Sequence, residues 1–229
     1  NFSIALSGLG VVANDQVQLL NAAEQAIGTA TVSSIDVANG YVLVTPQNSF
    51  ADGSQVLKAR IVDRAGNTGA LSPGLTISIS TSIPNATTPV LQTASDSGRS
   101  SSDRITQRTA PTFTGVGTSG DTVKLYDGSQ LLGTGQVVGG TWSITIAAVA
   151  DGSYTLRALV IDNAGNESSF SSGVGITVDT MRPVAPVIAG PQVVSKSATP
   201  VISGTAEAFA IVNVYEGLHL IGTTTADGL

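Results

Sequence analysis

The chain has 229 residues, of which 41% are hydrophobic, 11% are charged and only 4% are aromatic. Its net charge of −6 and its lack of basic clusters argue against nucleic acid and anionic membranes as partners, and no apolar run reaches the roughly 20 residues of a membrane span. One histidine and no cysteine leave neither a thiol nucleophile nor a histidine-rich zinc site. We therefore expect no enzymatic activity and no membrane insertion in this part of the chain.

The apolar residues are mostly Val, Ile, Leu and Ala, and the other abundant residues are Gly, Ser and Thr. β-branched residues between glycine-rich turns are typical of short strands, whereas helices need more Glu, Lys and Arg than this chain has. The sequence therefore predicts an all-β fold without a helix.

An internal repeat is the strongest signal in the sequence. Residues 51–67 recur in closely similar form at 150–166, 99 positions later. Three shorter blocks each occur three times in the same order: 6–10, 113–117 and 202–206; 17–20, 123–126 and 212–215; 27–29, 132–134 and 221–223. A period of roughly 90–105 residues matches one immunoglobulin-like β-sandwich per copy.

The repeat divides the chain into three parts, which are residues 1–82, 83–180 and 181–229. We expect the first two parts to be Ig-like sandwiches and the third to be the N-terminal half of another. In the second copy, alternation and turn residues predict six strands, at 111–116, 122–127, 130–138, 141–147, 153–161 and 173–179.

Two segments rich in Ser, Thr, Asn or Pro separate the copies, namely 82–110 and 180–200. The second carries Pro183, Pro186, Pro191 and Pro200. Because proline fixes φ and lacks a backbone N–H, such segments are expected to act as stiff connectors outside the sheets.

Several motifs follow one another in a familiar order, at residues 95–98, 103–106, 109–115, 123–128, 162–166 and 178–180. Together they resemble the bacterial immunoglobulin-like repeats of giant type I-secreted adhesins, such as the SiiE-type and Bap-type surface proteins. The resemblance implies a secreted, cell-surface stalk with a role in virulence, attachment to host cells or biofilm matrix, and Ca²⁺ at domain junctions. It also implies neighbouring repeats of the same chain as partners, with host glycans or receptors bound through other repeats.

The candidate Ca²⁺ ligands are Asp63, Asp96, Asp103, Asp162, Asn166 and Asp179, and the resemblance carries most of this assignment. In an Ig-like sandwich the loop 162–166 lies at the end where the chain enters the domain. The segment with Asp96 and Asp103 is expected to lead into the same end, so that these carboxylates converge between the first and second copies. Ser80 departs from the pattern, because the second copy has Asp179 at that position, so the two junctions need not bind Ca²⁺ equally.

Plain turn chemistry is the alternative for every one of these residues, because Asp-Gly and Asn-Gly pairs also form ordinary turns. We favour that interpretation for Asp52, Asp127 and Asp151. Two rival functions also stay open, namely a carbohydrate-binding module and a spacer sandwich of a secreted hydrolase. A carbohydrate module would need a surface row of aromatics, whereas Trp142 is expected in the core, Tyr154 at a tyrosine corner and His219 on an exposed strand.

Overall fold

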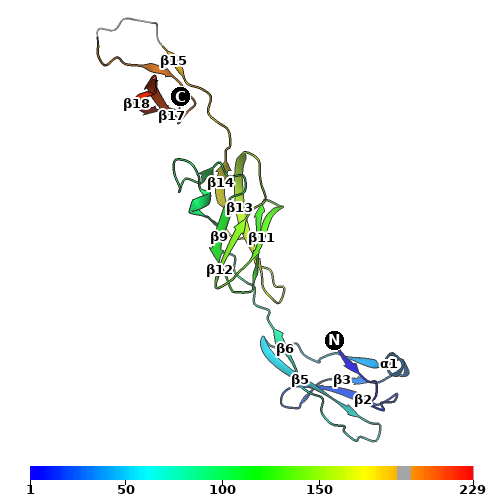
Figure 1. The fold of residues 1–229 in the computed structure, drawn as a ribbon. Helices are drawn as coiled ribbons and strands as arrows, with labels where there is room; N and C mark the ends of the chain where they lie inside the picture. The colour runs from blue at the N-terminus through cyan, green and yellow to red at the C-terminus, as the bar shows by residue number, and fades with distance from the viewer. Residues whose placement is uncertain (190–196, 229) are drawn as a thin grey trace.

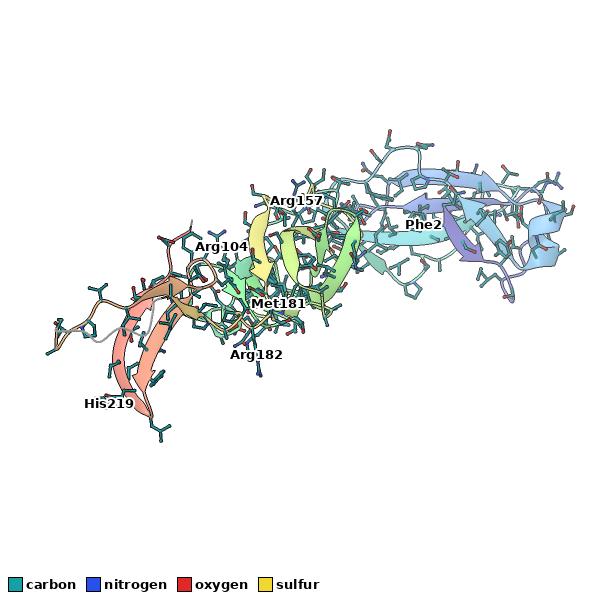
Figure 2. The ribbon with its side chains drawn as sticks, turned by 90° about the horizontal axis from the view of Figure 1, so that it is seen from above. Phe2, Arg104, Arg157, Met181, Arg182 and His219 are labelled. Atoms are coloured by element: carbon teal, nitrogen blue, oxygen red, sulfur yellow. The ribbon has the colours of Figure 1, made fainter. Side chains whose placement is uncertain are left out.

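The computed structural model describes residues 1–189 and 197–228. Almost all of its regular structure is β, arranged as three successive bodies along the chain, and the predicted all-β Ig-like fold is confirmed (Figure 1). Side chains cover all three bodies along their length (Figure 2). In the described residues, no helix is both long and apolar enough to cross a membrane.

The first repeat is a sandwich of a two-stranded and a four-stranded sheet. In the small sheet, β1 (Phe2–Ala5) pairs antiparallel with β4 (Tyr41–Val44). The large sheet has the order β3-β2-β5-β6, with bounds Ala26–Thr31, Gln16–Leu20, Gly53–Val62 and Leu75–Ile79. Alternate residues of these strands, such as Val17, Leu19 and Val44, face inward and form one apolar core.

The second repeat has the same design with more strands. One sheet has the order β12-β9-β7, with bounds Thr141–Thr145, Thr112–Val116 and Val90–Leu91. The other has the order β11-β10-β13-β14-β8, with bounds Gln130–Gln136, Thr122–Asp127, Gly152–Ile161, Val174–Val178 and Ile105–Thr106. The six strands predicted for this copy are all present, and Phe113, Leu125 and Leu156 are fully buried between the two sheets.

The segment 82–110 is not the external connector that its composition indicates. Its strand β7 pairs with β9, a 3₁₀ turn at Thr93–Ser95 follows, and β8 pairs parallel with β14 in the opposite sheet. Buried hydroxyls hold the crossing between sheets, since Thr106 Oγ1 donates to the Ser95 carbonyl (2.6 Å) and Ser95 Oγ accepts from the Thr112 N–H (2.9 Å). Polar residues can therefore lie inside the sandwich here because they satisfy one another.

The prediction of no helix is also wrong, because one short helix, α1 (Ser34–Asn39), precedes β4. Local capping explains it: Ser33 and Asp36 form a reciprocal capping box, and Gly40 ends the helix with φ of 77°. The helix buries none of its residues, so the apolar periodicity by which helices are usually recognised is missing.

The structure also corrects the alignment of the first sequence block. Leu6 N donates to the Gly40 carbonyl as Gly117 N does to the Gly140 carbonyl, so β1 corresponds to β9 and Phe2 to Phe113. Residues 7–10 form a turn in which Gly8 and Gly10 have positive φ, rather than the strand with which they were aligned. A Ser-Gly pair can form part of a turn or part of a strand, so only the observed strand pairing shows which alignment is correct.

One turn recurs in all three copies, just before β2, β10 and β17. Asn14, Gly120 and Phe209 each have positive φ there, and each donates its N–H to the end of the following hairpin. The next residue is Asp15, Asp121 or Ala210. The three copies thus share one backbone conformation but differ in charge at this position.

The third body consists of two antiparallel pairs. β15 (Val187–Ala189) pairs with β16 (Ser203–Thr205), and β17 (Ile211–Glu216) pairs with β18 (His219–Thr225). Its apolar side chains are largely exposed. Pro191 lies outside the described residues, and the boundaries at 82/83 and 180/181 stay predictions.

Candidate metal site at the repeat junction

The loop after β13 faces the first repeat, and hydrogen bonds within this loop position the carboxylate of Asp162. Asp162 Oδ1 accepts from the N–H groups of Ala164 (2.9 Å) and Asn166 (2.8 Å), and Oδ2 accepts from Asn166 Nδ2 (2.9 Å). These bonds stabilise the ionised form, and the Asn166 side chain is the largest cause that lowers the pKa of Asp162 below its usual value. The same Asn166 Nδ2 donates to the Ser80 carbonyl (3.0 Å), which ties the loop to the first repeat.

Asp121 is the second carboxylate at this end of the repeat, and the sequence analysis missed it. The residue is 5% exposed, and its carboxylate accepts no hydrogen bond from the described residues. Burial, with a smaller contribution from the charge of Asp162, raises the pKa of Asp121. Its counterpart Asp15 differs, because Asp15 Oδ2 accepts the Val12 N–H at 2.9 Å.

A cleft of about 570 Å³ lies between the repeats, where these two carboxylates meet the end of the first repeat. Asp121, Asp162 and Asn163 line it from the second repeat, and the connecting chain between Ser78 and Asn85 lines the other side. A Cβ on Gly120 would come within 2.6 Å of Asn163 Nδ2, so glycine lets the Asn163 side chain lie over the turn that carries Asp121. Residues with two carboxylates and one amide therefore line the cleft.

The convergence expected for Asp96 and Asp103 with Asp162 is not found. The Asp96 carboxylate accepts the Arg104 N–H (3.1 Å), and the Arg104 carbonyl accepts the Thr177 N–H. Thr177 lies beside the Gly152 end of β13, whereas Asp162 follows Ile161 at its other end. Ten residues of β13 separate the two ends, or about 30 Å. The cause is the crossing of residues 93–106, which carries them to the far end of the sandwich.

Asp96 nevertheless has an unusual environment at that far end. The side chain is 6% exposed, and its Oδ1 has no hydrogen-bond partner among the described residues. Asp103 is exposed and its Oδ1 accepts the Ile105 N–H at 3.1 Å. Arg104, between Asp103 and Ile105, has a φ of 63°, a conformation that an L-residue other than Asn or Asp seldom adopts.

The remaining acidic candidates lie apart from the junction. Asp63 repeats the Asx turn of Asp162 through Ala65 and Asn67, and Asn67 lowers its pKa. Asp179 Oδ1 accepts only the Met181 N–H (2.9 Å). In the described part of the chain, no three His, Cys, Asp or Glu side chains come together as a metal-binding group.

The three aspartates expected in turns, Asp52, Asp127 and Asp151, accept hydrogen bonds that stabilise the structure around them. Asp52 and Asp151 occupy equivalent positions, and they accept hydrogen bonds from Thr81 and Thr180 at the far end of each repeat. Asp127 Oδ1 accepts the Thr155 N–H at 2.9 Å. Their carboxylates thus have the backbone and hydroxyl donors that Asp121 lacks.

The aromatic and histidine predictions are confirmed. Trp142 is buried in the core, and Tyr154 donates its hydroxyl to the Ala150 carbonyl (2.8 Å) as a tyrosine corner does. His219 lies exposed on β18 (Figure 2). A buried Trp142 cannot serve as a stacking platform for sugar rings.

Comparison with known families settles the class of the second repeat. Residues 82–180 match the bacterial Ig-like domain. This Ig-like domain includes β7 and β8, in agreement with the pairing of both strands inside the sandwich. No curated protein sequence matches the chain.

Solved structures similar to this chain include the following three. The BSP domain of a biofilm-associated protein is 20% identical, and the match covers 76% of this chain and 26% of that one with a TM-score of 0.31. The fibronectin(III)-like modules of CbhA from Clostridium thermocellum are 16% identical, with 74% of this chain and 80% of that one covered and a TM-score of 0.42. A tetra-tandem repeat from the extending region of a large adhesion protein is 20% identical, with 95% of this chain and 57% of that one covered and a TM-score of 0.34. The chain spans about a quarter of the first of these structures and just over half of the third.

Proposed function

We propose that this chain is part of the stalk of a bacterial surface adhesin, in which Ig-like repeats act as spacers and catalyse no reaction. Two complete sandwiches of one design follow each other on a short connection, and the second matches the bacterial Ig-like domain. Secretion by a type I route, a cell-surface location and attachment to host cells or biofilm matrix belong to this proposal. The sequence resemblance supports them.

The proposal includes Ca²⁺ at the junction of the first and second repeats, and one observation carries it. Asp121 is a residue only 5% exposed whose carboxylate has no hydrogen-bond donor among the described residues, and it lines a cleft together with the ionised Asp162. The charge of Asp162 disfavours the ionised form of Asp121, for which no donor compensates, so a divalent cation is the natural complement. The residues present fit this group, because Ca²⁺ prefers six to eight oxygen ligands from carboxylates, amides, carbonyls and water.

Different residues of the chain would supply the charge, the neutral oxygen ligands and the positioning contacts of this site. Asp121 and Asp162 would contribute the negative charge, and the Asn163 amide and the carbonyls of residues 80–85 would contribute neutral oxygens. Asn166 positions Asp162 and contacts Ser80, so the loop is already organised towards the first repeat. Bound Ca²⁺ would supply a positive charge shared by both repeats and would thereby stiffen the connection.

The other candidate ligands belong to separate positions in this proposal. Asp96 and Asp103 form a second candidate position at the far end of the Ig-like domain, where the free Asp96 oxygen is the motivating feature. Asp63 and Asp15 form the corresponding pair at the start of the first repeat. Asp179 takes the place of Ser80 at the junction with the third body, where Ala210 replaces Asp121. We therefore expect the second junction to respond less to Ca²⁺ than the first.

Calorimetry and small-angle scattering of the whole chain, with Ca²⁺ or with a chelator, test the calcium site. At a hundredfold excess over Kd, Ca²⁺ should stabilise the folded state by about 2.7 kcal/mol, and it should narrow the range of particle shapes. Asp121→Asn should abolish most of this response, and Asp127→Asn should keep it. In chelator the Asp121→Asn variant should have a melting temperature no lower than that of the wild type, because the substitution removes an unfavourable buried charge. Equal melting and shape with Ca²⁺ and chelator would refute the site.

A further inference from the structure

One exposed loop of the second repeat, residues 97–104, contacts the third body. Arg99 Nη1 donates a hydrogen bond to the Phe209 carbonyl (3.0 Å). The two residues are 110 positions apart in the sequence, and neither belongs to the segment 180–186 that connects the two bodies. The contact therefore joins the bodies independently of their covalent connection.

Hydrogen bonds fix both ends of this loop to the sandwich. Ser97 Oγ accepts the Gln107 N–H (3.0 Å) and forms a second hydrogen bond with Thr106 Oγ1 (2.9 Å). At the other end of the loop, the Arg104 N–H donates to the Asp96 carboxylate (3.1 Å). The arginine between these two ends therefore starts from a defined position.

The chain leaves the second repeat beside the base of the same loop. The Asp179 N–H donates to the Thr106 carbonyl (2.9 Å), so the first residue after β14 is tied to β8. Pro183 and Pro186 then restrict the backbone of the connection. The third body is thus attached at two points, the connection and Arg99. Two points of attachment restrict its rotation more than one does.

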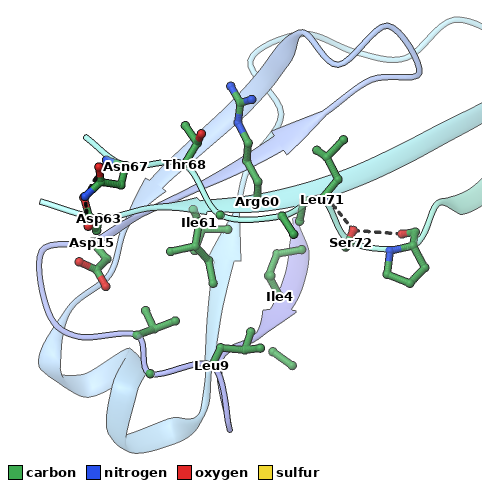
Figure 3. A pocket seen from close by; sticks show the side chains of 18 residues that line it. Ile4, Leu9, Asp15, Arg60, Ile61, Asp63, Asn67, Thr68, Leu71 and Ser72 are labelled. Atoms are coloured by element: carbon green, nitrogen blue, oxygen red, sulfur yellow. Dashed lines mark hydrogen bonds between the residues drawn. The ribbon is translucent and has the colours of Figure 1, made fainter. Parts of the chain in front are cut away.

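The acceptor carbonyl belongs to the positive-φ turn that all three copies share. In the first repeat the residue after this turn, Asp15, lies at the same end as Asp63 and Asn67 of the loop after β5 (Figure 3). In the second repeat Asp121 likewise lies at the same end as Asp162. In the second and third copies this end meets the preceding part of the chain. The turn is therefore in place to be contacted by a preceding repeat.

Backbone conformation, rather than a particular side chain, is what the three turns have in common. Phe209 has a φ of 64°, which a phenylalanine seldom adopts, and its N–H donates to the Ala226 carbonyl (3.1 Å). Asn14 and Gly120 hold the same position with φ of 74° and 97°. Because Arg99 binds a backbone oxygen, the side chain at this position can differ between copies without loss of the contact.

We propose that residues 97–104 are the surface by which the Ig-like domain docks on the next repeat, with Arg99 as the anchor on the carbonyl of the positive-φ turn. The partner is another repeat of the same chain, recognised by the conformation of that turn. In the third body Ala210 replaces the carboxylate of Asp121, and the guanidinium supplies the positive charge. Arginine stays protonated at any physiological pH, so this docking needs no Ca²⁺ and goes beyond the calcium site proposed above.

Distances between spin labels on the whole chain test the proposal by double electron–electron resonance. The chain has no cysteine, so Ser143→Cys on β12 and His219→Cys on β18 provide one defined pair of labels across the second junction. Arg99→Ala should broaden the distance distribution, because it lowers the ratio of docked to undocked molecules by about two- to fivefold, the range of one exposed charged contact. Arg108→Ala is the matched control, since this arginine follows β8 and its side chain forms no hydrogen bond with the described residues of the third body. It should leave the distribution unchanged.

A second variant tests recognition of the backbone. Phe209→Asn introduces the residue type of Asn14 and keeps the carbonyl, so it should retain the narrow distribution, and unchanged far-ultraviolet circular dichroism would show that each variant is folded. Equal distributions for the wild type and Arg99→Ala, equal effects of Arg99→Ala and Arg108→Ala, or loss of docking in folded Phe209→Asn would each overturn the proposal. A distribution that narrows only when Ca²⁺ is added would assign the second junction to a metal instead. The labels report the second junction alone, so this test and that of the first junction can fail separately.

Discussion

At the scale of single residues, the two sandwiches solve one packing problem in different ways. The indole of Trp142 occupies the space beside Gly115, where a Cβ would collide with the ring. In the first repeat the same two positions hold Val42 and Ile4. A large residue on one strand is therefore matched by a small residue on its neighbour, and the total volume is kept.

We predict that Gly115→Ile destabilises the second repeat by about 1–3 kcal/mol or more, because it overpacks the core against Trp142. The double change Gly115→Ile and Trp142→Val recreates the pair of the first repeat, so it should recover part of the loss. Thermal unfolding followed by circular dichroism measures both. A double variant that is less stable than the single one would contradict the compensation.

Asp162 gives a pH-dependent prediction with a definite sign. Its pKa in the folded state is lowered from 3.8 by the hydrogen bonds in its loop, so its stabilising effect is present above pH 3.8 and is lost as pH falls through the folded pKa. In chelator, Asp162→Ala should lower the melting temperature of the second repeat at pH 7, and the difference should shrink at pH 3 and below. Asp63→Ala should act in the same way on the first repeat only. A difference that persists unchanged at pH 2 would show that the charge is not responsible.

At the scale of elements, the segment 82–110 decides where the domain begins. It contributes a strand to each sheet, and the crossing between them buries Ser95, Asp96 and Thr106. Backbone groups that enter the sandwich must be paired, and this segment pairs them through β7, β8 and side-chain hydroxyls. The folding unit therefore includes the segment rather than starting after it.

Two adjacent residues of β7 test this role. Leu91 faces the core and is 8% exposed, whereas Val90 is 59% exposed on the opposite face. We expect Leu91→Ala to destabilise the second repeat by about 2–4 kcal/mol, and Val90→Ala to cost much less. Denaturant unfolding of the whole chain, followed by the fluorescence of Trp142, provides the comparison. Equal small effects would show that the segment lies outside the cooperative unit.

At the scale of the whole molecule, the repeats differ in how completely their cores are covered. The buried apolar cluster of the second repeat holds 15 residues, with members from seven strands, whereas that of the first repeat holds 8. Because stability grows with the apolar area removed from water, the two domains should not unfold together. Their short connection offers little contact through which one could stabilise the other.

We predict two unfolding transitions for the whole chain, with the first repeat unfolding at lower temperature. Trp142 is the only tryptophan and lies in the second repeat, so its fluorescence reports that domain alone. Far-ultraviolet circular dichroism, which senses all strands, should therefore begin to change before Trp142 fluorescence does. Coincident transitions by both probes would contradict independent domains.

The sequence by itself determined the fold class and the strands of the second repeat. Alternating apolar residues and Asp-Gly turns are local signals, and strands such as β10 and β13 need nothing else to be located. The corner position of Tyr154 and the buried position of Trp142 followed from the same local pattern. The exposed helix α1 was missed because only its capping residues, and no apolar face, mark it.

The tertiary structure alone decided which polar residues meet. The parallel pairing of β8 with β14 joins residues about 70 positions apart, and no local pattern encodes it. This pairing moves Asp96 and Asp103 to the far end of the domain, away from Asp162. The same holds for Asp121, which reads as an ordinary turn residue in the sequence. Asp121 lies beside Asp162 because the antiparallel pairing of β10 with β13 places Thr122 opposite Ile161, and a carboxylate's environment rather than its identity determines what it can bind.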